Sequence, residues 1–317
     1  MKYAKWVRYV VISAVCVAGA GAAEDAGRTF AFEYRAAVGE VAGDAKIWIP
    51  VPQDTDHPTI TELTVETKAD YSYVTDADYG NQFLLIEWDG SEIEVSIRFV
   101  AHRVRRTAES GDSFEPLGAA ERARYLSASR MVVTDGVVAA EAQRIAGNAD
   151  TAHSKARSLY DHIVSTVRYD KSGEGWGRGD AVYACDTRAG NCTDFHSLFI
   201  GEARSLGVPS RFLMGFSIPR DEPSGEIGGY HCWGEYYDDA IGWVPLDASE
   251  AFKAPARRDE LFGGLDADRV QFTVGRDIVL PGMSGEPLNF AIYPYLEVDG
   301  QPNTNVAYSF RYRDVAE

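Results

Sequence analysis

The spacing of hydrophobic residues changes twice along this chain, and this change limits the folds available to it. Between residues 28 and 105 apolar and polar residues alternate, as in the segment from Ile93 to Phe99. A period of two gives a strand one apolar and one polar face. Turn residues such as Asp89-Gly90 separate the alternating runs. The pattern predicts an antiparallel β-sandwich over residues 28–105.

After residue 105 the apolar residues recur at steps of three and four, which is the period of a helix. One such stripe covers residues 137–145 and a second covers 152–167. Strand patterns return at Ser210 and continue to the C-terminus. We therefore expect an α+β protein, with a helical connector over 106–150 and a second domain over 151–317.

The first residues have the order of segments found in a secretory signal. Lys2, Lys5 and Arg8 precede an apolar run over 9–17, and small residues follow it. The run is too short to span a bilayer comfortably. We expect residues 1–22 to be removed on export, which leaves a periplasmic or secreted protein with no stable membrane span. An uncleaved N-terminal anchor is the alternative.

The charge balance excludes one class of partner. The chain has 31 lysines and arginines against 48 aspartates and glutamates, a formal net charge of −17. Removing the three basic residues in 1–22 changes −17 to −20. Binding to nucleic acid needs a basic face that displaces counterions from phosphates. Nucleic acid is therefore not an expected partner.

The segment from Arg188 to Phe199 (RAGNCTDFHSLF) predicts a helix with a cysteine in its first turn. With Asn191 as the N-cap, Cys192 is the first helical residue and Asp194 the third, which is close to a capping box. Free N–H groups and the helix dipole at this position favour a thiolate and can stabilise an oxyanion. Cys192 is a candidate nucleophile, and a thiol packed in the core is the alternative.

A base and an acid are available in a predicted hairpin. Two strand patterns, 229–237 and 243–247, are joined by a short turn segment. Pairing centred on Asp239 puts His231 opposite Asp247, and a register shifted by two residues leaves them diagonal neighbours. Asp247 would then fix the tautomer of the imidazole while the other ring nitrogen meets the thiol.

These motifs resemble those of the transglutaminase-like superfamily, cysteine enzymes with a papain-like core. The resemblance is carried by residues 190–194 (GNCTD), 207–211 (GVPSR), 229–235 (GYHCWGE) and 242–247 (GWVPLD). It implies that Cys192 is the nucleophile, that His231 is the general base and acid, and that Asp247 orients the histidine. It also implies a papain-like catalytic domain, for which an N-terminal β module is a common companion in bacterial members.

The expected activity is acyl transfer from amide bonds of peptides or proteins, through a thioester on the cysteine. Water as the acceptor gives hydrolysis or deamidation and an amine gives transamidation, and the sequence leaves this choice open. Trp176, Asn191 and Tyr230 are candidate substrate-binding residues, Trp176 because it lies in a glycine-rich loop ahead of the nucleophile. A non-catalytic binding protein that keeps the scaffold is the alternative.

Nearby residues permit other interpretations. His196 lies four residues after Cys192 on the same helical face and is an alternative base. The cysteines and histidines of this region would suffice for a zinc ion, but no pair has the usual ligand spacing. No metal and no cofactor are therefore expected, with a calcium requirement left open.

An odd number of cysteines, three, remains after residue 22. Cys232 follows His231 directly, and alternation along a strand directs it to the opposite face, away from the catalytic cluster. In an oxidising compartment, Cys185 and Cys232 could form a disulfide that leaves Cys192 free. Two separate buried thiols are the alternative.

Overall fold

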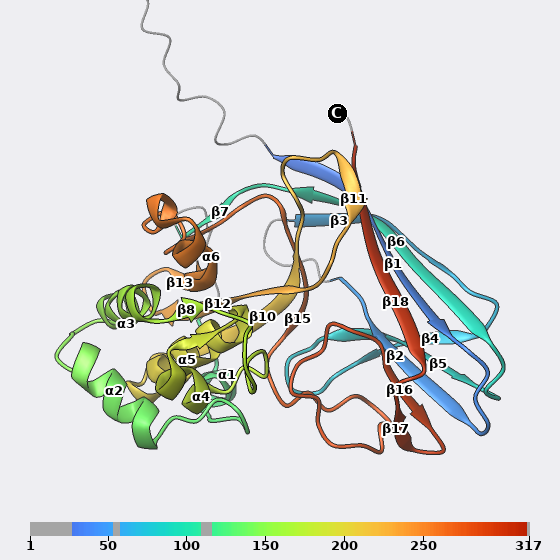
Figure 1. Cartoon of the computed structure of the whole chain (residues 1–317), viewed down its shortest axis with the longest axis horizontal. Coiled ribbons are helices and arrows are strands. Elements are labelled where there is room, and N and C mark those ends of the chain that lie inside the picture. Colours follow the sequence, from blue (N-terminus) through green and yellow to red (C-terminus); the bar gives the residue numbers. More distant parts are fainter. Residues whose placement is uncertain (1–26, 53–57, 109–115, 316–317) are drawn as a thin grey trace, which may run out of the picture.

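The computed structural model describes residues 27–52, 58–108 and 116–315 (Figure 1). The expected export signal, residues 1–22, lies outside these ranges. Within them, no helix is both long and apolar enough to cross a bilayer. A β-sandwich stands beside a layer of helices that packs on a further sheet. This arrangement confirms the expected α+β class.

The sandwich contains two five-stranded antiparallel sheets. Its strands are β1 (Arg28–Val38), β2 (Ala45–Pro50), β3 (Pro58–Glu66), β4 (Tyr71–Thr75), β5 (Gln82–Trp88), β6 (Ile93–Arg103), β11 (Ser224–Glu226), β16 (Tyr295–Val298), β17 (Gln301–Asn303) and β18 (Val306–Asp314). The sheet orders are β11-β18-β1-β6-β3 and β17-β16-β2-β5-β4. Phe30, Phe32 and Tyr34 on β1 are buried and alternate with partly exposed residues, as a period of two predicts.

The C-terminal strands correct the expected domain boundaries. β18 pairs with β1 from Phe30↔Asp314 to Val38↔Val306, and β16 pairs with β2. Residues 295–314 therefore belong to the sandwich rather than to one continuous domain over 151–317. β18 covers a sheet edge that would otherwise be unpaired. Alternation within a C-terminal segment predicts a strand but not the sheet that the strand joins.

The second layer is built on a four-stranded antiparallel sheet. Its spatial order is β13 (Gly242–Leu246), β12 (His231–Asp238), β10 (Ser210–Ser217) and β15 (Arg269–Val274). The helix α5 (Cys192–Ser205) packs on β10 and β12 and is buried over almost its whole length. Around it lie α1 (Ala119–Leu126), α2 (Gly136–Ala146), α3 (Ala152–Thr166), α4 (Ala181–Thr187) and α6 (Ala248–Lys253). Because α1 and α2 contact α5, the expected connector over 106–150 is part of this layer.

Short elements tie the start of α5 to its surroundings. β8 (Arg168–Tyr169) pairs in parallel with β9 (Ala189–Gly190), directly before Cys192. The segment ahead of the helix is therefore held by backbone hydrogen bonds as well as by its cap.

Two further short elements lie elsewhere in this layer. β7 (Arg106–Thr107) pairs with β14 (Gly264–Leu265), and η1 (Pro255–Arg257) is a single 3-10 turn.

One apolar core joins the sandwich to the second layer. The ring centroid of Phe32 on β1 lies 5.3 Å from that of Phe216 on β10 and 5.8 Å from that of Phe272 on β15. Aromatic rings at these separations pack closely. The sandwich therefore supports the sheet that carries the candidate site.

Candidate active site

The start of α5 confirms the predicted cap. Asn191 is the N-cap, and its Oδ1 accepts a hydrogen bond from the N–H of Thr193 at 2.9 Å. In return, Oδ2 of Asp194 accepts one from the N–H of Asn191 at 2.9 Å. A Cβ on Gly190 would overlap the side chain of Asp194. These contacts fix Cys192 as the first residue of the helix.

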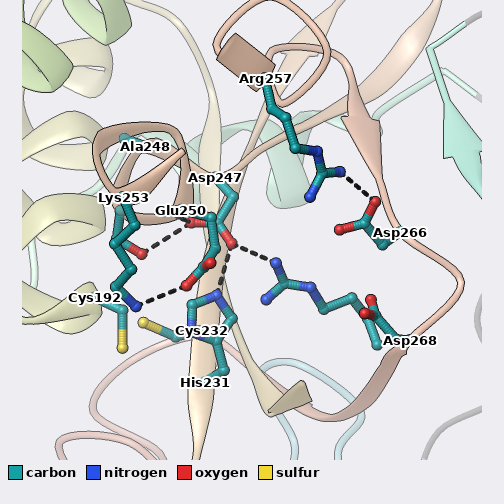
Figure 2. A network of polar contacts seen from close by, with 12 residues as sticks. Cys192, His231, Cys232, Asp247, Ala248, Glu250, Lys253, Arg257, Asp266 and Asp268 are labelled. Atoms are coloured by element: carbon teal, nitrogen blue, oxygen red, sulfur yellow. Dashed lines mark hydrogen bonds and ion pairs between the residues drawn. The ribbon is translucent and has the colours of Figure 1, made fainter. Parts of the chain in front are cut away.

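Three polar side chains from distant parts of the chain meet at this helix end (Figure 2). Cys192 is only 2% exposed, and it lies close enough to His231 for the imidazole to lower the pKa of its thiol. The Nε2–H of His231 donates to Oδ2 of Asp247 at 2.6 Å. This bond leaves Nδ1 of the imidazole for the sulfur. The structure thus brings together the residues that the sequence proposed as nucleophile, base and acid.

The hairpin register differs by two residues from the predicted one. Tyr237 pairs with Trp243, whereas centring on Asp239 would pair Tyr237 with Ile241. Asp247 consequently lies just past β13, where it is the N-cap of α6, and its Oδ1 accepts from the N–H of Glu250 at 2.9 Å. Residues 239–241 form a three-residue connection, and Gly242 follows it with a φ of +82°. Such loops place a glycine in the left-handed region, which explains the shift in register.

Buried charges set the protonation of this cluster. Burial alone would raise the pKa of Asp247, but the charges of His231 and Arg269 outweigh it and hold that pKa well below its usual range. A guanidinium nitrogen of Arg269 lies 2.9 Å from Oδ2 of Asp247. Burial and the charge of Arg269 lower the pKa of His231, yet Asp247 and the hydrogen bond of Cys192 raise it to about 9. His231 is therefore an imidazolium at neutral pH.

The surroundings of Cys192 favour its thiolate form. The hydrogen bond from Cys232 lowers the pKa of Cys192, and burial opposes that shift. The hydrogen bond and charge of His231 then add to the lowering, so the pKa lies well below its usual value. A thiolate beside an imidazolium is the reactive form of a cysteine nucleophile.

His196 does not have the geometry of a base for Cys192. Its Nδ1–H donates to the backbone carbonyl of Cys192 at 2.7 Å, and its Nε2 accepts from the N–H of Ala248 at 3.1 Å. Both ring nitrogens are therefore engaged by backbone groups, and burial lowers the pKa of the imidazole. His196 links the first turn of α5 to the start of α6.

The glycine-rich loop ahead of Cys192 is held by Asp194. Its carboxylate accepts hydrogen bonds from the N–H groups of Gly177 at 2.7 Å and Gly179 at 3.0 Å. Trp176 in this loop is half-buried. The guanidinium of Arg276 donates to the carbonyl of Gly179 at 3.0 Å. Asp194 and Arg276 therefore position the loop, a role that the sequence analysis did not find for either residue.

The predicted disulfide between Cys185 and Cys232 is wrong. All three cysteines in the described ranges are free and buried. The thiol of Cys185, on α4, donates to Oε2 of Glu141 at 2.9 Å, whereas Cys232 lies at the candidate site. α5 packs on the strand face that carries Cys232 and Gly234, so the thiol expected to point away from the cluster joins it.

A series of aromatic side chains extends from Tyr230, which precedes His231, to the exposed ring of Tyr308. The hydroxyl of Tyr230 accepts from Nδ2 of Asn191 at 3.2 Å. Its ring lies 5.6 Å from that of Phe290 and 5.9 Å from that of Tyr293, and Tyr293 stacks on Tyr308 at 4.5 Å. A cavity of about 240 Å³ is bounded by this pair of tyrosines and by the backbone of residues 226–229.

A larger cavity, about 770 Å³, lies on the sandwich and has no cysteine or histidine in its lining. Among the described residues there is no cluster of three or more histidine, cysteine or acidic side chains placed to hold a metal ion.

Fold and site together define a cysteine-centred α+β domain, and known proteins contain a similar one. Residues 139–248 match the model of the transglutaminase-like superfamily, so this part of the chain is a transglutaminase-like domain. An uncharacterized protein of Haemophilus influenzae is 26% identical over 303 residues, which cover 82% of each chain. The uncharacterized protein YebA of Bacillus subtilis is 25% identical over 122 residues, or 34% of this chain and 17% of YebA.

A solved structure agrees with the whole architecture. The structure of a candidate cysteine protease from Cytophaga hutchinsonii superposes with a TM-score of 0.63 and covers 92% of both chains. The sequences are 16% identical, so the likeness concerns the fold alone. The sandwich and the cysteine-bearing layer therefore occur together in another protein.

Proposed function

We propose that this protein is an exported thiol enzyme that transfers acyl groups from amide bonds of peptides or proteins. The observation that supports it most is the chain of contacts from Cys192 through His231 to Asp247, in which the imidazole bonds the carboxylate at 2.6 Å. A cysteine nucleophile needs a base within hydrogen-bond reach and a group that orients the base. A binding protein would need none of the three.

The chemistry follows from the protonation states of the cluster. The Cys192 thiolate attacks the carbonyl carbon of the amide, and the helix N-terminus stabilises the oxyanion. The N–H groups of Thr193 and Asp194 already donate to Asn191, so the N–H of Cys192 itself is the available donor of the first turn. The C–N bond then breaks as the imidazolium of His231 protonates the leaving amine, and a thioester remains.

The second half of the reaction resolves the thioester. Neutral His231 takes a proton from water or from an amine as that molecule attacks, and the sulfur leaves as a thiolate with the imidazole protonated again. Water yields a carboxylic acid, and an amine yields a new amide. Asp247 keeps its negative charge throughout and stabilises the imidazolium.

The aromatic series from Tyr230 to Tyr308 supports a peptide or protein as the substrate. Tyr308 is 43% exposed at the outer end of the stack that reaches Tyr230, next to the cluster. Tyrosine faces bind apolar side chains and planar amide groups. We propose that Tyr230 and Trp176 contact the substrate, whereas Asn191 acts through the helix cap and through its bond to Tyr230. Export through residues 1–22 would expose the enzyme to peptides outside the cytoplasm.

Mass spectrometry of products tests the proposal. Protein lacking residues 1–22 is incubated with glutamine-containing and cell-wall-type peptides, with and without a primary amine. Cleavage, deamidation and amine addition give different mass changes. We expect at least one of them with the unaltered protein and none with Cys192→Ala. Equal turnover by Cys192→Ala would refute the assignment of the nucleophile.

A further inference from the structure

Cys232 directly follows the candidate base on β12, and it is fully buried. On β12 it pairs with Met214 of β10, while the preceding residue, His231, pairs with Gly215. Its sulfur lies beside that of Cys192 in Figure 2. His231 reaches the same sulfur from the end of the strand. Cys192 is thus approached by two neighbouring residues of one strand.

The thiol of Cys232 lies near His196, which cannot accept its proton. The sulfur of Cys232 lies 3.7 Å from Nδ1 of His196. That nitrogen carries the proton donated to the Cys192 carbonyl, because Nε2 of His196 accepts from Ala248. A protonated ring nitrogen has no lone pair for a thiol. The sulfur of Cys192 lies beside that of Cys232 in Figure 2, and as a thiolate it can accept a hydrogen bond. The interaction of the two thiols lowers the pKa of Cys192 and raises that of Cys232.

We infer that Cys232 is a positioning residue, a thiol that donates its proton to the Cys192 sulfur and holds that sulfur as an oriented thiolate. The inference rests on the proposed function and assigns a further residue to the same site. Burial and the neighbouring Cys192 raise the pKa of Cys232 well above its usual value, so this thiol remains a donor at neutral pH. Hydrogen bonds to an ionised acceptor are about twice as strong as neutral ones.

Other ionisable groups face the pair from every side, and a test must leave them in place. They are Asp194 and His196 of α5, His231 of β12, Asp247 at the start of α6, Arg269 of β15, Arg276 after it, and the hydroxyls of Tyr169, Tyr230 and Tyr293. Substituting Cys232 alone changes none of them. A shift in the titration of Cys192 would then report the lost donor.

The experiment compares Cys232→Ala and Cys232→Ser with the unaltered protein and with Cys185→Ser. Cys185 is the matched control, a buried thiol that donates to Glu141 away from the site. Each protein receives a short pulse of iodoacetamide at pH values from 4 to 10, and peptide mass spectrometry measures alkylation of Cys192. Thermal unfolding verifies that each variant is folded.

Losing the donor should raise the pKa of Cys192 by about one unit, which reduces the thiolate about tenfold at acidic pH. A more basic thiolate is also more nucleophilic, by about threefold per unit. Cys232→Ala should therefore react about threefold more slowly than the unaltered protein at low pH and about threefold faster at the alkaline plateau. Cys232→Ser, whose hydroxyl can donate, should restore the original profile, and Cys185→Ser should match it.

Superimposed profiles for Cys232→Ala and the unaltered protein would overturn the inference, as would a uniform change at all pH values. A profile of Cys232→Ser equal to that of Cys232→Ala would overturn it as well. Alkylation measures the thiolate without a substrate. A shifted profile therefore supports the role of Cys232 even if no amide is turned over, whereas the product assay alone tests the proposed function.

Discussion

Replacing Asp247 by Asn should destabilise the protein strongly, because this carboxylate is the shared counter-charge of two buried cations. Oδ2 lies 2.6 Å from Nε2 of His231 and 2.9 Å from a guanidinium nitrogen of Arg269. Arg269 is 2% exposed, and its Nε and Nη1 have no partner among the described residues. Removing one member of a buried ion pair typically costs about 3–5 kcal/mol.

The substitution isolates the charge because Asn keeps an oxygen at the helix cap. Oδ1 of Asp247 accepts from Ser249 and from the N–H of Glu250, and an amide oxygen can do the same. The pKa of His231 also provides an estimate of the lost free energy of unfolding. Its upward shift from 6.5 to about 9 corresponds to about 3 kcal/mol. Both routes lead to the same order of magnitude.

Urea unfolding at pH 7.5, followed by tryptophan fluorescence, measures this loss. The matched control is Asp259→Asn, which removes a carboxylate whose side chain is 85% exposed and pairs with Arg157 at the surface. Exposed ion pairs contribute little to stability, so the control should unfold like the unaltered protein. Equal urea midpoints for Asp247→Asn and Asp259→Asn would refute the reasoning about the buried charges.

Four further predictions concern the site. His231→Ala should reduce amide turnover about 10³-fold, the usual scale for a general acid–base, and restoration of the rate by added imidazole would be consistent with that role. Between pH 6.5 and about 9 the folded protein, relative to the unfolded chain, carries an extra proton on His231 and lacks one on Cys192, so the two effects on the pH dependence of stability cancel. In Cys192→Ala the contribution of Cys192 is lost but Asp247 still raises the His231 pKa, so the unfolding free energy should fall as pH rises above 6.5. Gly190→Ala should lower the unfolding free energy by about 1–3 kcal/mol through overlap with Asp194, whereas Gly228→Ala, with open space around it, should not. Tyr308→Ala should raise KM for peptides about fivefold, about 1 kcal/mol, without a change in thermal unfolding; an unchanged KM would exclude this tyrosine from the substrate site.

Local signals in the sequence were sufficient to place Cys192 at the start of a capped helix. Asn191, Cys192 and Asp194 are neighbours in sequence, and capping chemistry depends on such short spacings. The contact of His231 with Asp247 was also predictable, since a hairpin keeps both residues at the same end even when its register slips by two. The change of hydrophobic period likewise sufficed for the α+β class.

Non-local contacts were not predictable in this way. Tertiary packing decides which face of β12 lies against α5, and strand alternation alone wrongly removed Cys232 from the cluster. The disulfide was suggested by the odd number of cysteines, a count that says nothing about which thiols lie close together. Arg269 lies in a strand with no recognisable motif, so nothing in the sequence connects it to Asp247. β18 joins β1 across almost the whole length of the chain. Strand alternation does not encode such partners.

The central proposal is that Cys192 forms a covalent acyl intermediate, and intact-protein mass spectrometry tests it most directly. The protein is mixed with a glutamine-containing peptide and quenched in acid within milliseconds to seconds, a pH at which a thioester survives. We predict a mass increase equal to the acyl part of the peptide, located on Cys192 after digestion and absent from Cys192→Ala. Turnover of the peptide with no adduct on Cys192 at any time, or an adduct on another residue, would contradict the proposal.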